Sequence, residues 1–118
     1  MKGIDYHEMI DKLISVTESR KLKWEGDAFN NDTYSARVGN CTVKMCGYYD
    51  GVVDDMVYTL ELFNADALSF KVLRYTAAED NTDYIDLVKL FEEIGDSYYR
   101  IRESEEDIMD SLNKLYYG

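Results

Sequence analysis

The sequence predicts an α+β fold: an N-terminal helix, an antiparallel meander of four or five strands, and two C-terminal helices packed on one face of the sheet. Apolar residues recur every three or four positions toward both ends of the chain and alternate with polar ones in between. No proline and no Gly/Ser-rich linker interrupts the 118 residues. Separate blocks of helix and strand are typical of an α+β protein, and the length fits one domain, so we expect residues 1–118 to form a single α+β domain.

The first helix is expected from about Asp5 to Arg20. Ile10, Leu13 and Ile14 fall on one face of it, and the charged side chains fall mostly elsewhere. This amphipathic pattern predicts a helix that covers a sheet.

The middle of the chain is expected to form strands rich in β-branched and aromatic residues. Leu22 and Trp24 point to the same side of the first strand, so we expect Trp24 to be buried against the helices. The expected strands are Lys21–Glu25, Asp32–Gly39, Asn40–Tyr48, Met56–Asn64 and Ala67–Tyr75.

Two hairpins can be aligned from the sequence by matching apolar positions across the turn. A two-residue turn at Gly39-Asn40 pairs Val38 with Cys41, Ala36 with Val43, and Tyr34 with Met45. A turn through Asn64–Asp66 pairs Leu62 with Leu68, Leu60 with Phe70, and Tyr58 with Val72. The second alignment also places Val57 opposite Leu73 on the other side of the sheet.

The C-terminal block predicts two helical segments. The first runs from Asp83 to about Arg100 and carries an apolar stripe. Ser104, followed by three acidic residues, resembles the N-cap of a further helix, whose apolar face continues through Leu112 to the C-terminus. The pattern leaves open whether the chain breaks near Arg102 or only bends there.

The two cysteines, Cys41 and Cys46, lie five positions apart on one expected strand. An odd separation places them on opposite faces of the sheet, with Cys41 in the core and Cys46 outward. A disulfide or a shared metal ion requires side chains that meet, so we expect two free thiols.

Motifs for catalysis are missing, with no Gly-rich phosphate loop, nucleophile elbow or Cys–His pair in the sequence. His7 is the only histidine and is expected on the exposed first turn of the helix. Three aspartates between Asp50 and Asp55 resemble a calcium loop, but Val52 and Val53 break the required alternation of ligands, which favours a turn. We therefore expect neither an enzyme, nor a cofactor, nor a metal site.

The net charge of −11 comes from 24 acidic and 13 basic residues, and residues 79–110 alone contain 12 acidic and three basic ones. Nucleic-acid binding needs clustered Lys and Arg, so direct binding is disfavoured, whereas a protein with a basic surface suits this charge. The first turns carry Asp5, Glu8 and Asp11, unlike a signal peptide, and no apolar run approaches the ~20 residues that cross a bilayer. We therefore expect a cytoplasmic protein that does not bind membranes.

Two surfaces are candidates for partner binding. The first is an acidic ridge on the C-terminal helices, which we expect to face solvent. The second is the outer face of the sheet, where tyrosines and apolar residues suit a partner or a homodimer. The ridge consists of Glu92, Glu93, Asp96, Glu103, Glu105, Glu106 and Asp107, and the sheet face of Tyr48, Val57, Leu73 and Tyr75, beside Cys46.

Three segments together resemble a loose group of small bacterial proteins of unknown function, often associated with phages or mobile elements. They are Leu22-Lys23-Trp24-Glu25, the strand from Thr33 to Val38, and the closing helices from Leu90-Phe91-Glu92-Glu93 to Leu112. The group is similar in its leading helix, L-x-W strand, meander and helical end. The resemblance implies the fold and, by analogy, an interaction or interference role, without any catalytic residue.

The sequence therefore predicts a small acidic protein-interaction module. Its sharper form is an inhibitor or immunity-type protein that blocks a basic, nucleic-acid-binding surface of a partner. A small-molecule binder with a pocket between sheet and helices, lined by Trp24 and tyrosines, is the alternative, and an unrecognised enzyme is the third.

Overall fold

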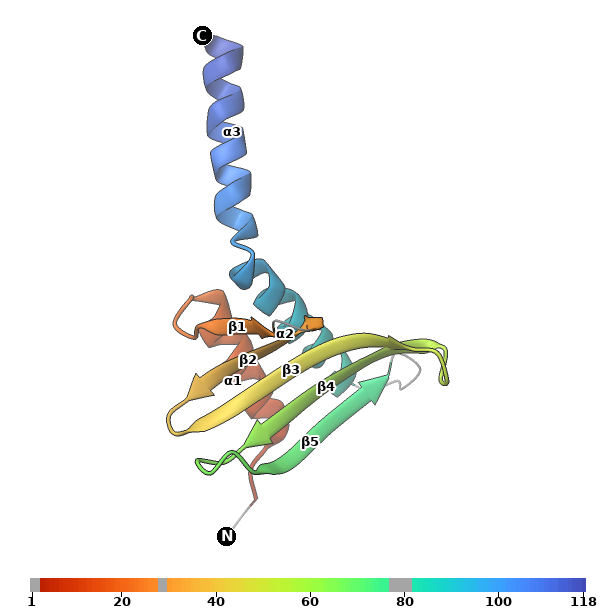
Figure 1. The fold of residues 1–118 in the computed structure, drawn as a ribbon. Helices are drawn as coiled ribbons and strands as arrows, with labels where there is room; N and C mark the ends of the chain where they lie inside the picture. The colour runs from red at the N-terminus through yellow and green to blue at the C-terminus, as the bar shows by residue number, and fades with distance from the viewer. Residues whose placement is uncertain (1–2, 28–29, 77–81) are drawn as a thin grey trace.

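The computed structural model describes residues 3–27, 30–76 and 82–118. It confirms the α+β prediction: an N-terminal helix, one five-stranded antiparallel sheet and two C-terminal helices (Figure 1). The strands follow one another across the sheet in chain order, β1-β2-β3-β4-β5. The elements are α1 (Tyr6–Glu18), β1 (Trp24–Asp27), β2 (Asn30–Val38), β3 (Cys41–Asp50), β4 (Asp55–Phe63), β5 (Ser69–Thr76), α2 (Thr82–Tyr98) and α3 (Ile101–Tyr117).

Helix α1 begins at a side-chain cap, and its last turn makes a buried side-chain hydrogen bond to β1. The Asp5 carboxylate accepts hydrogen bonds from the backbone N–H groups of His7 and Glu8, which the first turn of a helix leaves without partners. Near the other end, the Trp24 indole N–H donates to the Thr17 hydroxyl at 3.0 Å. Trp24 is 4% exposed, which confirms that it is a core residue.

The hairpin of β2 and β3 has the predicted register. Val38 pairs with Cys41, Ala36 with Val43, and Tyr34 with Met45. Gly39 adopts φ of +62°, a conformation that glycine reaches without strain, and this residue opens the two-residue turn.

The predicted register of β4 with β5 is wrong by three residues. Leu60 pairs with Leu73, not with Phe70, and Tyr58 pairs with Tyr75. Two features cause the shift. The turn is longer and holds residues 64–68 out of the strands, with the Asn64 side chain accepting hydrogen bonds from the N–H groups of Asp66 and Leu68. An irregularity between Leu62 and Phe63 adds one more residue and makes the total shift odd. An odd shift exchanges the two faces of a strand, so Leu73 and Tyr75 face the core while Phe70 and Val72 are exposed.

Helices α1 and α2 both cover one face of the sheet, behind it in Figure 1. Their apolar stripes pack against the inward residues of β2, β3 and β4, and the largest fully buried side chains there include Met45, Leu60, Leu87 and Leu90. Tilted aromatic rings continue this contact along α2, with centroid distances of 5.4 to 5.9 Å. In order they are Tyr98, Tyr34, Phe91, Tyr58 and Tyr84.

The chain breaks between α2 and α3, which settles the question left open by the sequence pattern. Arg100 adopts the left-handed conformation, with φ of 53°, and α3 begins at Ile101. The predicted cap, Ser104, lies within α3, where its hydroxyl donates to the Arg100 carbonyl at 3.0 Å. Helix α3 projects away from the body and extends the molecule to 62 × 36 × 29 Å (Figure 1).

Candidate functional site

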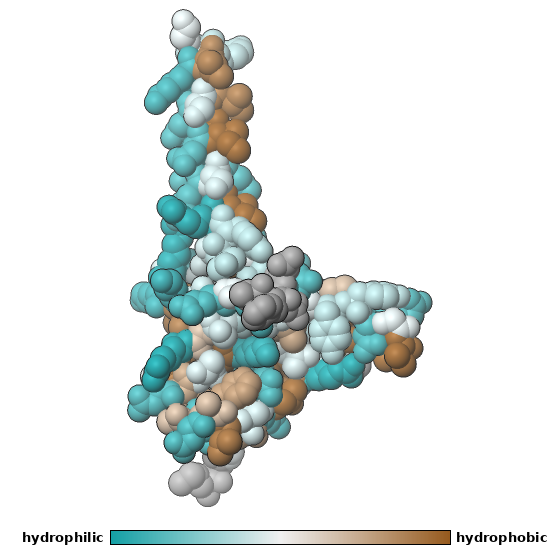
Figure 2. Space-filling view, viewed as in Figure 1, coloured by the Kyte–Doolittle hydropathy of each residue, from teal (hydrophilic) through white to brown (hydrophobic). Residues whose placement is uncertain are grey.

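Helix α3 is the most unusual surface of the molecule, because none of its residues is buried. Its apolar side chains nevertheless recur at helical spacing and share one face. Figure 2 shows apolar side chains along one side of the projecting helix. The members, which we call the α3 stripe, are Ile101, Ile108, Met109, Leu112, Leu115 and Tyr116, with exposed fractions from 39% to 82%.

The face of α3 opposite the stripe is acidic. At 100° per residue, Glu106 and Asp110 lie across the helix from Ile108 and Leu112. Glu105 differs from them, because it falls at the base of the stripe and lines a small polar cavity of about 180 Å³ against α1 and α2. The helix is therefore amphipathic, with a long apolar side and an anionic side.

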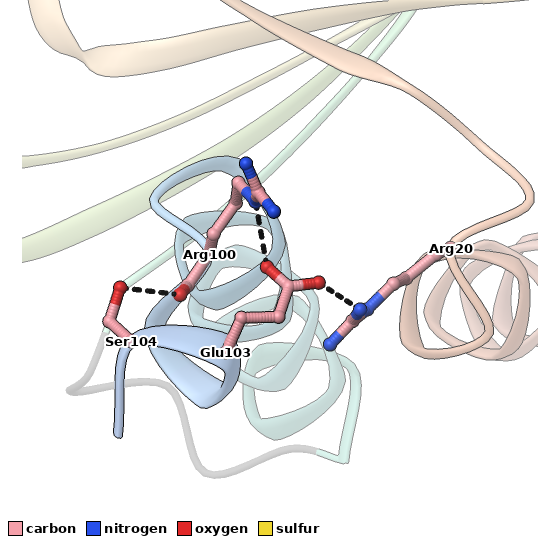
Figure 3. Close-up of polar contacts among 4 residues, drawn as sticks. All are labelled: Arg20, Arg100, Glu103 and Ser104. Atoms are coloured by element: carbon pink, nitrogen blue, oxygen red, sulfur yellow. Dashed lines mark hydrogen bonds and ion pairs between the residues drawn. The ribbon is translucent and has the colours of Figure 1, made fainter. Parts of the chain in front are cut away.

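An ion-pair cluster fixes the base of α3 to the body (Figure 3). The Glu103 carboxylate accepts from the Arg100 guanidinium at 2.8 Å and also from Arg20, which follows α1. The hydrogen bond from Arg100, together with the charge of Arg20, lowers the pKa of the Glu103 carboxyl below its ordinary value. Glu103, predicted as part of a free acidic ridge, is thus an ionised carboxylate paired with two guanidinium groups, and it holds α3 in place.

The remaining predicted ridge residues divide between α2 and α3. On α2, Glu92 and Asp96 are exposed, whereas Glu93 is partly buried, and desolvation, followed by the charges of Glu18 and Asp96, raises its pKa. Glu93, Asp96 and Glu105 surround the small polar cavity together with Arg20 and Arg102. The freely presented acids are Glu92 on α2, and Glu106, Asp107 and Asp110 on α3, while Glu79 and Asp80 lie outside the described residues.

The predicted sheet-face candidates are mostly absent from the open face of the sheet. Leu73 and Tyr75 pack toward the core because of the three-residue shift in β5, and Val57 is fully buried. Tyr48 is 39% exposed. These four side chains therefore do not form one exposed surface.

A second candidate surface is a groove of about 860 Å³ beside α1. Its floor is apolar, with Met9, Leu13 and Val16 from α1 facing Leu22 and Val38 from the sheet side. Val38 lies on the inner face of the sheet and is still 45% exposed, since no helix reaches this corner. The pocket expected around Trp24 is not this one, because Trp24 lies in the core.

Basic residues border the groove in an otherwise acidic molecule. Lys12 pairs with Glu8 at 3.0 Å, but Lys21 and Arg37 form no ion pair within the part of the chain that the structure describes. The Arg37 guanidinium donates to the Gly39 carbonyl at 3.4 Å. Two acids also line the groove, but Asp5 caps α1 and Glu8 pairs with Lys12. The groove thus combines an apolar floor with two cations, Lys21 and Arg37, that are available to an anionic group. We call it the α1 groove.

His7 has two carboxylate neighbours that sequence reasoning missed. Its Nδ1 lies 2.8 Å from Asp86 on α2, and its Nε2 lies 3.6 Å from Asp11. The i, i+4 spacing of His7 and Asp11 is visible in the sequence, whereas the contact with Asp86 depends on how α1 packs on α2. Although these residue types can bind a metal, both imidazole nitrogens face carboxylates, and we interpret the group as a link between the two helices.

Both cysteines are free thiols on opposite faces of β3. Cys41, expected in the core, is exposed because it pairs with Val38 at the uncovered corner of the sheet. Cys46 is half-buried, and desolvation raises the pKa of its thiol. The Asp50–Asp55 segment is a turn, as predicted, in which the Asp50 side chain accepts from the Val52 N–H at 2.9 Å.

No protein-family model, curated protein or solved structure matches the chain. Among the described residues, no helix has the length and apolarity needed to cross a membrane.

Proposed function

We propose that the protein is a small, non-catalytic interaction module that presents α3 to a partner protein. In this proposal, the α3 stripe enters an apolar groove of the partner, and basic residues beside that groove meet the acids of α3. The observation that carries the proposal is that α3 displays six large apolar side chains and buries none of its residues.

Physical chemistry supports an occupied stripe. Contiguous exposed apolar surface on a soluble protein commonly marks an interaction site, and an amphipathic helix laid into a groove is a recurrent form of recognition. Isolated helices of this length are marginal in water, so docking would also stabilise α3 itself. The spacing of Ile108, Leu112 and Leu115 places three anchors along one line.

The charge of α3 favours a basic partner. Acidic side chains beside an apolar anchor increase the association rate toward a basic surface and disfavour other acidic proteins. Clustered Lys and Arg are typical of proteins that bind nucleic acid, so the sharper proposal is an inhibitor or immunity-type protein that covers such a basic surface. The resemblance to small proteins of phages and mobile elements agrees with this role by analogy.

A photo-crosslinking experiment in the native host tests the proposal. A photoreactive residue at Leu112 should cross-link one basic protein, and the same residue at Asn113, outside the stripe, should cross-link it much less. Leu112→Asp should abolish the product while the body stays folded, because α3 contributes nothing to the core. Equal labelling from Leu112 and Asn113, or a product that persists in Leu112→Asp, would contradict the proposal.

A salt series separates the two parts of the interaction. Association should slow at least tenfold between 0.05 and 0.5 M salt, because shorter screening lengths weaken electrostatic steering. Glu106→Lys with Asp110→Lys should reproduce the slower rate at low salt, since both residues are exposed on α3. An association rate that is independent of salt would contradict a basic partner surface, although docking of the apolar stripe could still hold.

A further inference from the structure

We propose that the α1 groove receives the α3 stripe of a second copy of this chain. The inference rests on the proposed function, because it takes α3 as a docking helix, and it names one partner for that helix. The described part of the molecule exposes an apolar helix face, the α3 stripe, and an apolar groove, the α1 groove. A helix fits an elongated groove, and the acids of α3 suit the cations beside the groove.

The apolar surfaces are complementary in kind. The α1 groove is an open trough between α1 and the end of β2, with aliphatic side chains and Met9 on its floor. Leu112 and Leu115 on α3 are aliphatic anchors more than half exposed, and the adjacent Met109 can adapt to an irregular floor. Docking one into the other would remove both exposed apolar surfaces from water in a single contact.

The charges are complementary as well. Lys21 and Arg37 border the groove without a carboxylate partner in the described parts of the chain, in a protein with 24 acidic and 13 basic residues. The acids beside the α3 stripe, Glu106 and Asp107 among them, are exposed. Cations beside the groove favour an occupant that carries acidic side chains next to its apolar ones, as α3 does. Two parallel α3 helices, in contrast, would place acid beside acid.

The contact must form between molecules. Helix α3 points away from the body, and its direction is fixed at the Arg100 turn and by the Arg20–Glu103 ion pair (Figures 1 and 3). The lining of the α1 groove accordingly contains no residue of α3. Because helix and groove are different patches, the contact is heterologous, and it closes as a reciprocal dimer or ring or continues as a chain.

Self-docking would also regulate the proposed function. A second copy and the basic partner use the same α3 stripe, so they would compete for it. Unoccupied α3 would be most abundant in dilute protein. A partner that binds the α3 stripe more tightly than the α1 groove does would dissociate the self-assembly.

Complementation between variants tests the inference. Sedimentation velocity should show association of the wild type with rising concentration. Leu112→Asp damages the helix, Val38→Asp damages the groove, and each variant alone should be monomeric. Their equimolar mixture should recover a heterodimer, because one intact helix and one intact groove remain. Lys21→Glu with Arg37→Glu provides a second groove variant in case Val38→Asp unfolds. Asn113→Asp is the control, because Asn113 lies outside the stripe, about 100° around α3 from Leu112.

Each alternative gives a different result. Pairing of α3 with α3 leaves Val38→Asp associated and gives no recovery in the mixture. Association through the open sheet face, at Phe70 and Val72, leaves both variants associated. A wild type that stays monomeric at high concentration overturns the inference. So does a wild type that retains a bound amphipathic carboxylate in native mass spectrometry, when Val38→Asp loses that ligand. In that monomeric case, a Leu112 cross-link to a basic protein would keep the proposed function, whereas loss of both results would remove both proposals.

The Cys41 thiol allows a direct test of contact between the α3 stripe and the α1 groove. Cys41 is exposed and pairs across the hairpin with Val38, which lines the groove. In a Cys46→Ser background, Leu115→Cys should form an intermolecular disulfide with Cys41 under mild oxidation by copper phenanthroline. Lys114→Cys, on the other side of α3, should form it at least tenfold more slowly. Equal rates for the two variants would contradict docking of the stripe in the groove.

Discussion

At Gly47 the backbone of β3 lies directly beneath two aromatic rings. A Cβ atom built there would lie 2.8 Å from the Tyr58 ring and 3.2 Å from the Phe91 ring, closer than carbon atoms pack. Both rings belong to the aromatic row between α2 and the sheet. A single missing side chain therefore sets how closely α2 approaches β3 and β4.

Gly47→Ala should destabilise the fold by about 1–3 kcal/mol, the usual cost of overpacking a core. Urea unfolding followed by far-UV circular dichroism measures the change in the free energy of unfolding. Gly51→Ala is the matched control, because nothing lies within 4 Å of its Cβ position in the turn after β3. A Gly47→Ala variant as stable as Gly51→Ala would show that the rings have room to move.

Trp24 combines a large buried surface with one specific hydrogen bond to Thr17. Trp24→Ala should cost roughly 3–5 kcal/mol of unfolding free energy because it leaves a cavity. Trp24→Phe keeps most of the apolar volume and loses the indole N–H, so it should cost about 1–2 kcal/mol. Equal losses in the two variants, measured by circular dichroism, would mean that the hydrogen bond dominates over the cavity.

At the scale of elements, α3 is held by its first turn alone. Among the described residues, the ion pair between Glu103 and Arg20 joins α3 to the body, and Arg100 at the turn pairs with the same carboxylate, while the rest of the helix is exposed. Because the pKa of Glu103 is lowered in the folded protein, the stabilisation is fully present above the ordinary carboxyl pKa. It is lost as the pH falls through the lowered folded value.

Acid, or Glu103→Gln, should therefore loosen the orientation of α3 without melting the body. Spin labels on Asn113→Cys and Lys23→Cys, in a background without the native cysteines, report the distance between α3 and the residue that precedes β1. The distance distribution should be narrow at neutral pH and should broaden in acid, once the pH falls through the lowered pKa of the Glu103 carboxyl. Glu106→Gln is the control and should keep the narrow distribution, and a Glu103→Gln variant with an unchanged distribution would assign the orientation to packing.

The elements also show where sequence patterns suffice. The β2–β3 register was predictable because a two-residue turn leaves one alignment, which Gly39 makes sterically easy. The β4–β5 register was not. Hydrogen bonds that the Asn64 side chain accepts and the left-handed Ala67 lengthen the turn, and an irregularity between Leu62 and Phe63 adds a further shift. The apolar stripe of α3 was visible in the sequence, but its lack of a partner is a property of the tertiary fold. The α1 groove depends on where α1 stops covering the sheet, which no local pattern records.

At the scale of the whole molecule, the body and α3 contribute separately to stability. All core residues precede Arg100, and α3 has no buried residue. Deletion of residues 101–118 should change the free energy of unfolding of the body by less than about 0.5 kcal/mol, as expected for exposed positions. Small-angle scattering of dilute protein should show a smaller radius of gyration for the truncated protein than for the full chain, because α3 extends the molecule. Cooperative loss of the body on truncation would mean that α3 supports the core.

The turn at Arg100 gives α3 the mechanics of a lever. Seventeen residues of helix are about 25 Å long, so a rotation of about 20° at the pivot moves the far end by about 9 Å. A loss of one carboxylate charge at the pivot would thus enlarge the volume that Leu115 and Tyr116 sweep, at the end farthest from the body. Because the pivot lies at one end and the exposed anchors at the other, a change too small to disturb the core would alter how widely the protein reaches for a partner.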